Sequence, residues 1–223
     1  KVITFGRGSC DYTAADISYD AMGHATFTPI AFGKPAAPVS LGVPGEHNVY
    51  NALAAFALCR AMEIPSEQIV AGLSKFTGAD RRFQFKGVFH GATIIDDYAH
   101  HPSEIAASIQ AARKMTDKHL IVLFQPHTYT RTKAFLDDFA NELAKADEVG
   151  LCKIYEAREQ DIYGVSSVDI LERIEKRGTE CRYFPTFAEA QRYYAKKLSE
   201  NDLLITMGAG NVVTVGEELL KEK

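Results

Sequence analysis

The chain of 223 residues is 46% hydrophobic and 24% charged, which is typical of globular proteins and is enough for one large domain or two small ones. A net charge of −4 at pH 7 offers no basic surface for nucleic acid, and no apolar run approaches the roughly 20 residues that span a bilayer. The four cysteines form no CxxC pair, so we expect reduced thiols in the cytoplasm and no disulfide or metal framework. Binding to nucleic acid or membranes is therefore not expected.

The first part of the chain contains short β-prone runs separated by glycine and proline, which predict the strands and turns of an α+β region. The runs cover residues 2–6, 15–21 and 24–33. After Pro44, the residues Val49, Leu53 and Phe56 recur at helical spacing, and a second helix is expected within 66–76.

From about residue 88 onward, predicted strands and helices alternate strictly. The expected strands are 92–97, 119–125, 147–152, 181–184 and 203–208, and the expected helices are 102–115, 131–145, 166–177, 186–199 and 211–221. Five strands that alternate with five helices predict an α/β fold with a parallel, doubly wound sheet. We place the domain boundary between residues 87 and 88, which gives the domains 1–87 and 88–223.

Polar residues gather where three of these strands end. The clusters are residues 96–101, 125–131 and 207–211. Ligands of open α/β sheets bind beyond the carboxyl ends of the strands, and helix N-termini favour anions. We therefore expect the three clusters to share one edge of the sheet and to hold an anionic ligand there.

Simpler interpretations of these residues stay open. Asp97 or Ser103 could have no role other than capping the next helix. His100 and His101 could bind a metal, although metal-binding histidines are usually two or four residues apart and have a further ligand, so we expect no metal site. The segment GAGN at 208–211 lacks the full GxGxxG of dinucleotide folds and is consistent with a tight turn. No Ser-His-Asp or activated cysteine pattern is present.

Two further groups of residues precede the alternating region. Asn48 and Asn51 lie three residues apart in the first turn of a predicted helix, and paired amides can read an adenine edge. Capping of the helix by Asn48 explains the pattern equally well. Arg81 and Arg82 could bind a phosphate with paired hydrogen bonds, or could form a solvated basic turn.

Five segments in order resemble the Mur ligase family: PGEHNVYNALAA, RRF, DDYAHHPSEI, FQPHTYTRT and ITMGAGN. The resemblance extends over essentially the whole chain, and the third and fourth segments are similar to the alanine-adding branch. It implies that 1–87 is the C-terminal part of a central ATPase domain and that 88–223 is a Rossmann-like C-terminal domain. The phosphate-binding pattern GxxxxGK(S/T) is absent from the sequence. We therefore expect a fragment of a longer ligase that is inactive by itself.

The activity implied by the resemblance is ATP-dependent joining of L-alanine to the carboxylate of UDP-N-acetylmuramic acid, through an acyl phosphate. This reaction belongs to peptidoglycan precursor synthesis in the cytoplasm. ATP and Mg²⁺ are the implied cofactors, with the Mg²⁺ ligands expected upstream of this chain. A related ligase that recycles murein tripeptide and a non-catalytic nucleotide-binding module are the alternatives, while an NAD domain is disfavoured by the missing glycine fingerprint.

The resemblance also implies roles for single residues in nucleotide binding. Two asparagines and a histidine would meet the adenine, an arginine would reach the phosphates, and an aspartate would hold the ribose beside a tyrosine. These residues are His47, Asn48, Asn51, Arg82, Asp97 and Tyr98. Arg81 is the second choice for the phosphates.

Three residues carry the roles implied for the amino-acid site. His100 would face the reaction centre, while His127 and Arg131 would line the site, where a guanidinium can pair with the alanine carboxylate. Either His100 or His127 could accept the proton of the alanine ammonium near neutral pH, and the sequence does not choose between them. Thr128 stands where the family often has arginine.

Overall fold

The structure is a computed structural model that describes residues 2–21, 23–115 and 117–222. The chain divides into two compact units, Lys1–Ala79 and Asp80–Lys223. No helix in the described ranges is long and apolar enough to cross a membrane.

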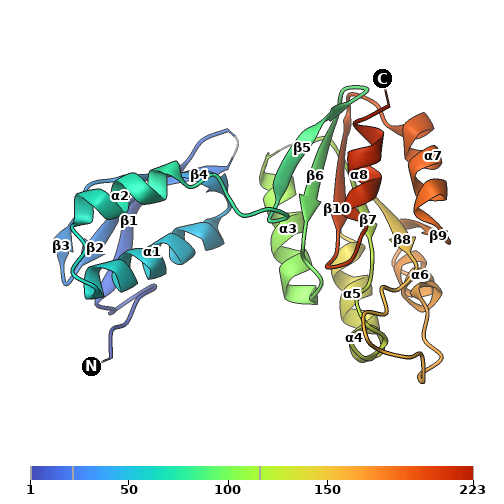
Figure 1. Cartoon of the computed structure of the whole chain (residues 1–223), viewed down its shortest axis with the longest axis horizontal. Coiled ribbons are helices and arrows are strands. Elements are labelled where there is room, and N and C mark those ends of the chain that lie inside the picture. The colour runs from blue at the N-terminus through green and yellow to red at the C-terminus, as the bar shows by residue number, and fades with distance from the viewer. Residues whose placement is uncertain (1, 22, 116, 223) are drawn as a thin grey trace. The chain divides into compact units, whose positions relative to one another are not determined.

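The first unit is an antiparallel sheet with two helices (Figure 1). Strand β2 pairs with β1, β3 and β4. The elements are β1 (Tyr12–Tyr19), β2 (His24–Ala31), β3 (Lys34–Pro35), β4 (Val39–Pro44), α1 (Glu46–Ala61) and α2 (Ser66–Lys75). Phe27 from β2 and Leu53 and Phe56 from α1 are fully buried in its core. The predicted strand at 2–6 does not form, since this segment contributes only an isolated bridge from Phe5 to Tyr12.

The second unit has a six-stranded sheet in the order β5-β6-β10-β7-β8-β9. Its strands are β5 (Gln84–Phe89), β6 (Ala92–Asp97), β7 (His119–Phe124), β8 (Glu148–Cys152), β9 (Glu180–Phe184) and β10 (Asp202–Met207). All neighbours are parallel except β5, which pairs antiparallel with β6. Near-continuous apolar runs, such as Leu120–Phe124, suit strands that are covered on both faces.

Helices cover both faces of this sheet. They are α3 (Pro102–Met115), α4 (Tyr129–Ala134), α5 (Leu136–Leu143), α6 (Ser167–Glu175), α7 (Phe187–Lys197) and α8 (Val213–Leu219). One buried cluster joins α3, α5 and α6 to the sheet, through Ile105, Phe139 and Ile170 among others. A second cluster joins α7 and α8 to the other face, through Tyr194 and Val215. The predicted doubly wound α/β fold is confirmed.

Two details differ from the sequence-based expectation. The helix expected at 131–145 is interrupted at Phe135, whose φ of −121° separates α4 from α5. The second unit begins at Asp80, earlier than the expected residue 88, because β5 pairs with β6 through contacts such as Gln84 with Asp96. The pairing of β5 is a tertiary contact, and its sequence reads locally as a basic turn followed by extended chain.

The strand order brings the predicted polar clusters together. Strand β10 lies between β6 and β7, so that the carboxyl ends of these three strands are neighbours. The carboxyl end of β8 lies next to that of β7. We call this edge of the second unit, where β6, β10, β7 and β8 end, the carboxyl rim.

Candidate active site

Two buried aspartates end β6 on the carboxyl rim. The carboxylate of Asp96 accepts hydrogen bonds from Arg81 Nε at 3.0 Å and from Thr206 Oγ1 at 2.7 Å. The carboxylate of Asp97 accepts from Ser108 Oγ at 2.6 Å and from the Ala99 N–H at 3.0 Å. Burial raises the pKa of both carboxyl groups, and these donors oppose the rise. Asp97 therefore links the end of β6 to α3 through Ala99 and Ser108. Its carboxylate can still accept further hydrogen bonds, because each oxygen has two lone pairs.

The two neighbouring arginines have different environments. Arg81, at a φ of 60°, binds Asp96 and donates from Nη2 to the Gly208 carbonyl at 2.7 Å. Arg82 is exposed, and its guanidinium lies 5.7 Å from the centre of the Tyr98 ring. Arg81 is thus used inside the fold, while the exposed Arg82 is the one of the pair that can reach a ligand.

His100 is held by the chain on both sides of it. Its Nδ1 lies 2.9 Å from the Tyr98 carbonyl oxygen and 3.3 Å from Glu104 Oε2. The same Glu104 oxygen accepts the backbone N–H groups of His100 at 3.0 Å and His101 at 3.2 Å. Glu104 thereby satisfies two backbone donors at the start of α3 and fixes the position of the imidazole.

His127 and Arg131 come from the segment that follows β7. The His127 ring lies 5.8 Å from the His100 ring, centre to centre, and Arg131 Nη1 lies 3.4 Å from His127 Nδ1. Burial lowers the pKa of His127, and the charges of Arg131 and His100 lower it further. The structure therefore brings together the three residues that the sequence proposed as catalytic.

The turn before α4 depends on Thr128. Its φ of 68° is in the left-handed region, which a β-branched residue seldom adopts. Its side chain accepts the N–H of Arg131 at 3.4 Å, and its backbone N–H donates to the Tyr155 carbonyl at 2.8 Å. This strained turn connects His127 to the start of α4, where Arg131 Nη1 lies 3.4 Å from His127 Nδ1.

The segment that follows β8 contributes residues that sequence reasoning did not single out. Tyr155 stacks on His127 with ring centres 5.4 Å apart and planes at 23°, and its N–H donates to the Pro126 carbonyl at 2.8 Å. Glu159 accepts from the N–H of Thr130 at 2.9 Å and from the Thr130 hydroxyl, whose hydrogen bond lowers the pKa of Glu159. No local pattern marks these residues, because only the pairing of β8 with β7 brings them to the site.

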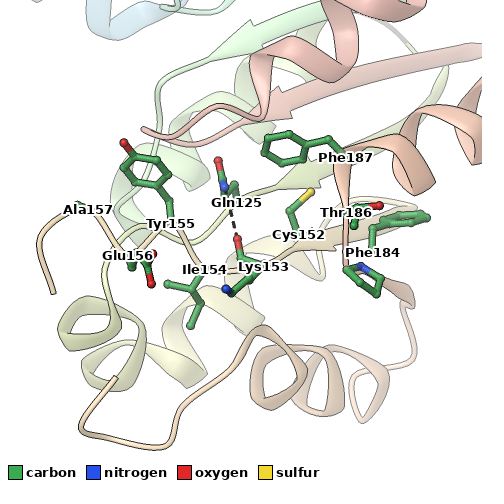
Figure 2. A pocket seen from close by; sticks show the side chains of 11 residues that line it. Gln125, Cys152, Lys153, Ile154, Tyr155, Glu156, Ala157, Phe184, Thr186 and Phe187 are labelled. Carbon is green, nitrogen blue, oxygen red and sulfur yellow. Dashed lines mark hydrogen bonds between the residues drawn. The ribbon is translucent and has the colours of Figure 1, made fainter. Parts of the chain in front are cut away.

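A pocket of about 440 Å³ lies where β7, β8 and β9 end (Figure 2). Its lining includes Gln125, Cys152, Tyr155 and Phe187. Burial raises the pKa of Cys152 to about 12, so this thiol stays protonated and is a poor nucleophile at neutral pH. The Gln125 side chain donates to the Lys153 carbonyl at 3.4 Å, the dashed line in Figure 2.

The GAGN segment has a packing role in this part of the structure. A Cβ at Gly210 would overlap the Gln125 side-chain oxygen and lie 2.9 Å from Tyr155 Cγ. The same Gln125 oxygen accepts the Val212 N–H at 3.2 Å. The glycine therefore allows the chain after β10 to pass close to Gln125. In dinucleotide folds a glycine after a strand lets the backbone approach a phosphate, whereas here Gly210 lets it approach a side chain.

In the first unit, the predicted asparagines occupy the first turn of α1. Asn48 Nδ2 donates to the Pro44 carbonyl at 2.7 Å, and Asn51 Nδ2 donates to Asn48 Oδ1 at 3.1 Å. The N-cap of α1 is Gly45, at a φ of 98°, so Asn48 does not cap the helix. A Cβ at Gly45 would lie 2.8 Å from His47 Cε1. The two amides share one face of α1, as expected from their spacing.

Comparison with known proteins agrees with these observations. The family described as "Mur ligase, glutamate ligase domain" matches residues 81–210, which is more than half of the chain. The chain belongs to the Mur ligase family. The matched range begins at Arg81 and ends at Gly210, so it includes β5 and the whole carboxyl rim of this Mur ligase domain.

Curated Mur ligases resemble the chain over its entire length. The UDP-N-acetylmuramate–L-alanine ligase of Agathobacter rectalis is 53% identical over 223 residues, which are 100% of this chain and 49% of that protein. The enzyme of the same name from Lachnospira eligens is 49% identical over 99% of this chain and 49% of its own length. The chain thus spans about half the length of the curated relatives it matches.

Solved structures show the same fold. The UDP-N-acetylmuramate–alanine ligase of Thermotoga maritima has a TM-score of 0.82 at 27% identity, over 98% of this chain and 47% of that one. A murein peptide ligase from Psychrobacter arcticus has a TM-score of 0.72 at 22% identity, over 98% of this chain and 45% of that one. The second likeness concerns the fold alone.

Within residues 2–21, 23–115 and 117–222, no group of three or more histidine, cysteine, aspartate or glutamate side chains is placed to hold a metal ion.

Proposed function

We propose that the chain is part of an ATP-dependent ligase that joins L-alanine to the carboxylate of UDP-N-acetylmuramic acid in peptidoglycan precursor synthesis. The observation that carries this proposal is the meeting of two histidines and an arginine on the carboxyl rim. His127 lies 5.8 Å from His100 between ring centres, and Arg131 lies 3.4 Å from His127. Relatives that are 53% and 49% identical over this chain carry the name of that ligase.

The proposed chemistry uses these side chains as follows. ATP transfers its γ-phosphoryl group to the muramyl carboxylate, which gives an acyl phosphate and ADP. Arg131 pairs with the carboxylate of alanine and directs its amine to the acyl carbon. The amine attacks, the carbon–nitrogen bond forms, and phosphate departs with the electron pair of the carbon–oxygen bond. One of the two histidines accepts a proton from the alanine ammonium before the attack.

Each unit contains residues for which we propose a role in nucleotide binding. In the first unit, we propose that His47, Asn48 and Asn51 meet the adenine, which is supported by the shared face of the two amides. In the second unit, we propose that Arg82 binds phosphate and that Asp97 binds the ribose hydroxyls beside Tyr98. The exposure of Arg82, in contrast to the internal pairing of Arg81, supports the choice between the arginines.

The 223-residue chain is not expected to turn over substrate alone, since its sequence has no GxxxxGK(S/T) segment to bind the phosphates of ATP. We propose that the rest of a longer ligase supplies that segment, the UDP site and any Mg²⁺ ligands. We also propose that the enzyme works in the cytoplasm, where ATP and the UDP-linked precursor are available.

The test joins this chain to the part of the Agathobacter rectalis ligase that it does not match. We expect phosphate release from ATP that requires both UDP-N-acetylmuramic acid and L-alanine. Release with murein tripeptide but not with alanine would instead identify a tripeptide-recycling ligase. A folded chimera that binds ATP and releases no phosphate with either acceptor would indicate a nucleotide-binding module. The variant Arg131→Ala tests the proposed alanine contact, and its KM for alanine should rise at least tenfold.

A further inference from the structure

The protonated nitrogen of His100 follows from its neighbours. Nδ1 lies 2.9 Å from the Tyr98 carbonyl oxygen and 3.3 Å from a Glu104 carboxylate oxygen. A carbonyl and an ionised carboxylate only accept hydrogen bonds, so Nδ1 must carry the proton. In the neutral ring, Nε2 is then the nitrogen with the free lone pair.

Glu104 is suited to hold that ring as a carboxylate. Burial raises the pKa of Glu104. The hydrogen bond from the His100 N–H, the His100 charge and the hydrogen bond from the His101 N–H all lower it, and together they outweigh burial, so the pKa is lowered overall. Glu104 is therefore ionised at neutral pH. Its Oε2 lies 3.3 Å from Nδ1 and holds the ring in the orientation that leaves Nε2 available to accept a proton.

His127 has the opposite arrangement. Its Nδ1 lies 3.4 Å from Arg131 Nη1, and a guanidinium only donates hydrogen bonds, so this Nδ1 must be the acceptor. The neutral ring then carries its proton on Nε2. Burial and the charge of Arg131 lower the pKa of His127, which keeps the ring neutral at physiological pH. His127 is thus prepared to donate a hydrogen bond from Nε2 and is poorly suited to accept a proton.

We propose that the two histidines divide the chemistry of the site: His100, positioned by Glu104, is the base for the incoming amine, and His127 is a neutral hydrogen-bond donor to the oxygen of the reacting carbonyl. This inference rests on the proposed ligase function. It adds Glu104 as a positioning residue, which acts on the substrates only through His100.

The proton and electron movements follow from this division. Nε2 of His100 takes one proton from the alanine ammonium, and the amine lone pair forms the carbon–nitrogen bond. The carbonyl π pair moves to oxygen, where Nε2–H of His127 stabilises the negative charge. Collapse of the intermediate expels phosphate with the carbon–oxygen electron pair, and phosphate takes the second nitrogen proton.

The tautomers can be tested on the chain itself, independently of activity. Two-bond proton–nitrogen NMR correlations of the ¹⁵N-histidine-labelled chain distinguish the tautomers, and the spectra of His100→Gln and His127→Gln assign the two rings. We expect Nδ1–H for His100 and Nε2–H for His127. The same tautomer in both rings, or the reverse assignment, would overturn the proposal.

Kinetics of the chimera test the roles. Glutamine can donate from the position of Nε2 but cannot take up a proton, so His127→Gln should keep kcat within about tenfold while His100→Gln should lower it by about 10² to 10⁴-fold. His127→Ala, which has no donor, should lose more activity than His127→Gln. Equal losses in His100→Gln and His127→Gln would contradict the division of roles.

Glu104→Gln tests the positioning residue. Glutamine retains an oxygen for the backbone N–H groups but lacks the charge, so we expect kcat to fall about tenfold with KM for alanine unchanged within twofold. Glu189→Gln is the matched control, because Glu189 accepts from the Thr186 hydroxyl at 2.9 Å in the first turn of α7, a different helix from the one that carries Glu104. Unchanged kcat in Glu104→Gln would remove its assigned role. If the unmodified chimera has no alanine-dependent activity, the ligase proposal fails, while the NMR result still decides the tautomers.

Discussion

Tyr194 is a buried residue at which a conservative substitution is expected to raise stability. Its side chain is fully buried, and its hydroxyl is the one buried side-chain polar atom without a hydrogen-bond partner in the described part of the chain. Burial also raises the pKa of Tyr194 well above its ordinary value, so the group stays a neutral hydroxyl. A buried polar group without a partner costs about 1–3 kcal/mol. Tyr194→Phe removes that cost and keeps the ring contact with Phe184, whose centre lies 5.6 Å away.

The small space left by the oxygen reduces the gain. A Cβ at Gly150 would overlap the Tyr194 hydroxyl, so the oxygen is closely packed and its removal leaves a cavity of about one atom. The net expectation for Tyr194→Phe is a stabilisation of about 1 kcal/mol, which corresponds to a Tm rise of about 3 °C for a unit of this size. Urea unfolding and thermal melting, followed by far-ultraviolet circular dichroism, measure both quantities.

The neighbouring tyrosine provides a control of opposite sign. The Tyr193 hydroxyl donates to Glu148 Oε1 at 3.4 Å and accepts from Lys197 Nζ at 3.1 Å. Tyr193→Phe should therefore destabilise the unit by about 1 kcal/mol. If Tyr194→Phe destabilises the protein as much as Tyr193→Phe does, the Tyr194 hydroxyl has a partner in solution and the reasoning is refuted.

Two further predictions concern charged groups. Arg81→Ala should lower the free energy of unfolding by about 3 kcal/mol, because it leaves the fully buried Asp96 without its cation. Arg82→Ala, at an exposed position, should change the free energy of unfolding by less than about 0.5 kcal/mol. If Arg82 binds phosphate as proposed, this second variant should also weaken ATP binding. Urea unfolding and calorimetric ATP titration of both variants check this, and equal destabilisation by the two would contradict it. The hydrogen bond from Arg113 lowers the pKa of Asp147 below its ordinary 3.8, so the stabilisation by this half-exposed pair is present above about pH 4 and is lost as the pH falls through the lowered pKa. Arg113→Ala should therefore cost about 0.5 kcal/mol at pH 7 and progressively less as the pH falls through the lowered pKa of Asp147, as measured by urea unfolding across that range. A cost that does not decrease with falling pH would show that the pair acts through packing instead.

Much of the second unit could be predicted from local patterns. Apolar runs such as Leu120–Phe124 marked the strands, and the polar residues that follow them marked the carboxyl rim. The family motifs identified His100, His127 and Arg131, and the structure brings these three together. Each of these signals is contained within a few neighbouring residues, which is why sequence reasoning could use them.

Other features depended on contacts between distant parts of the chain. The adjacent Arg81 and Arg82 could both bind a phosphate by their residue type, but pairing with Asp96 uses Arg81 inside the fold. Tyr155 carries no local signal, and it reaches His127 because β8 lies beside β7. The sequence indicates extended chain after the basic turn at Arg81 and Arg82, but only the antiparallel pairing with β6 makes this chain strand β5.

The sequence by itself determined the alternation of strands and helices, the positions where strands end in polar residues, and the membership of the chain in the Mur ligase family. Only the tertiary structure decided that β10 lies between β6 and β7, which nitrogen of each histidine faces a donor or an acceptor, and which arginine stays exposed. The physical reason is that hydrophobic periodicity and helix signals act over a few residues, whereas strand order and hydrogen-bond partners are set by packing among residues far apart in the chain.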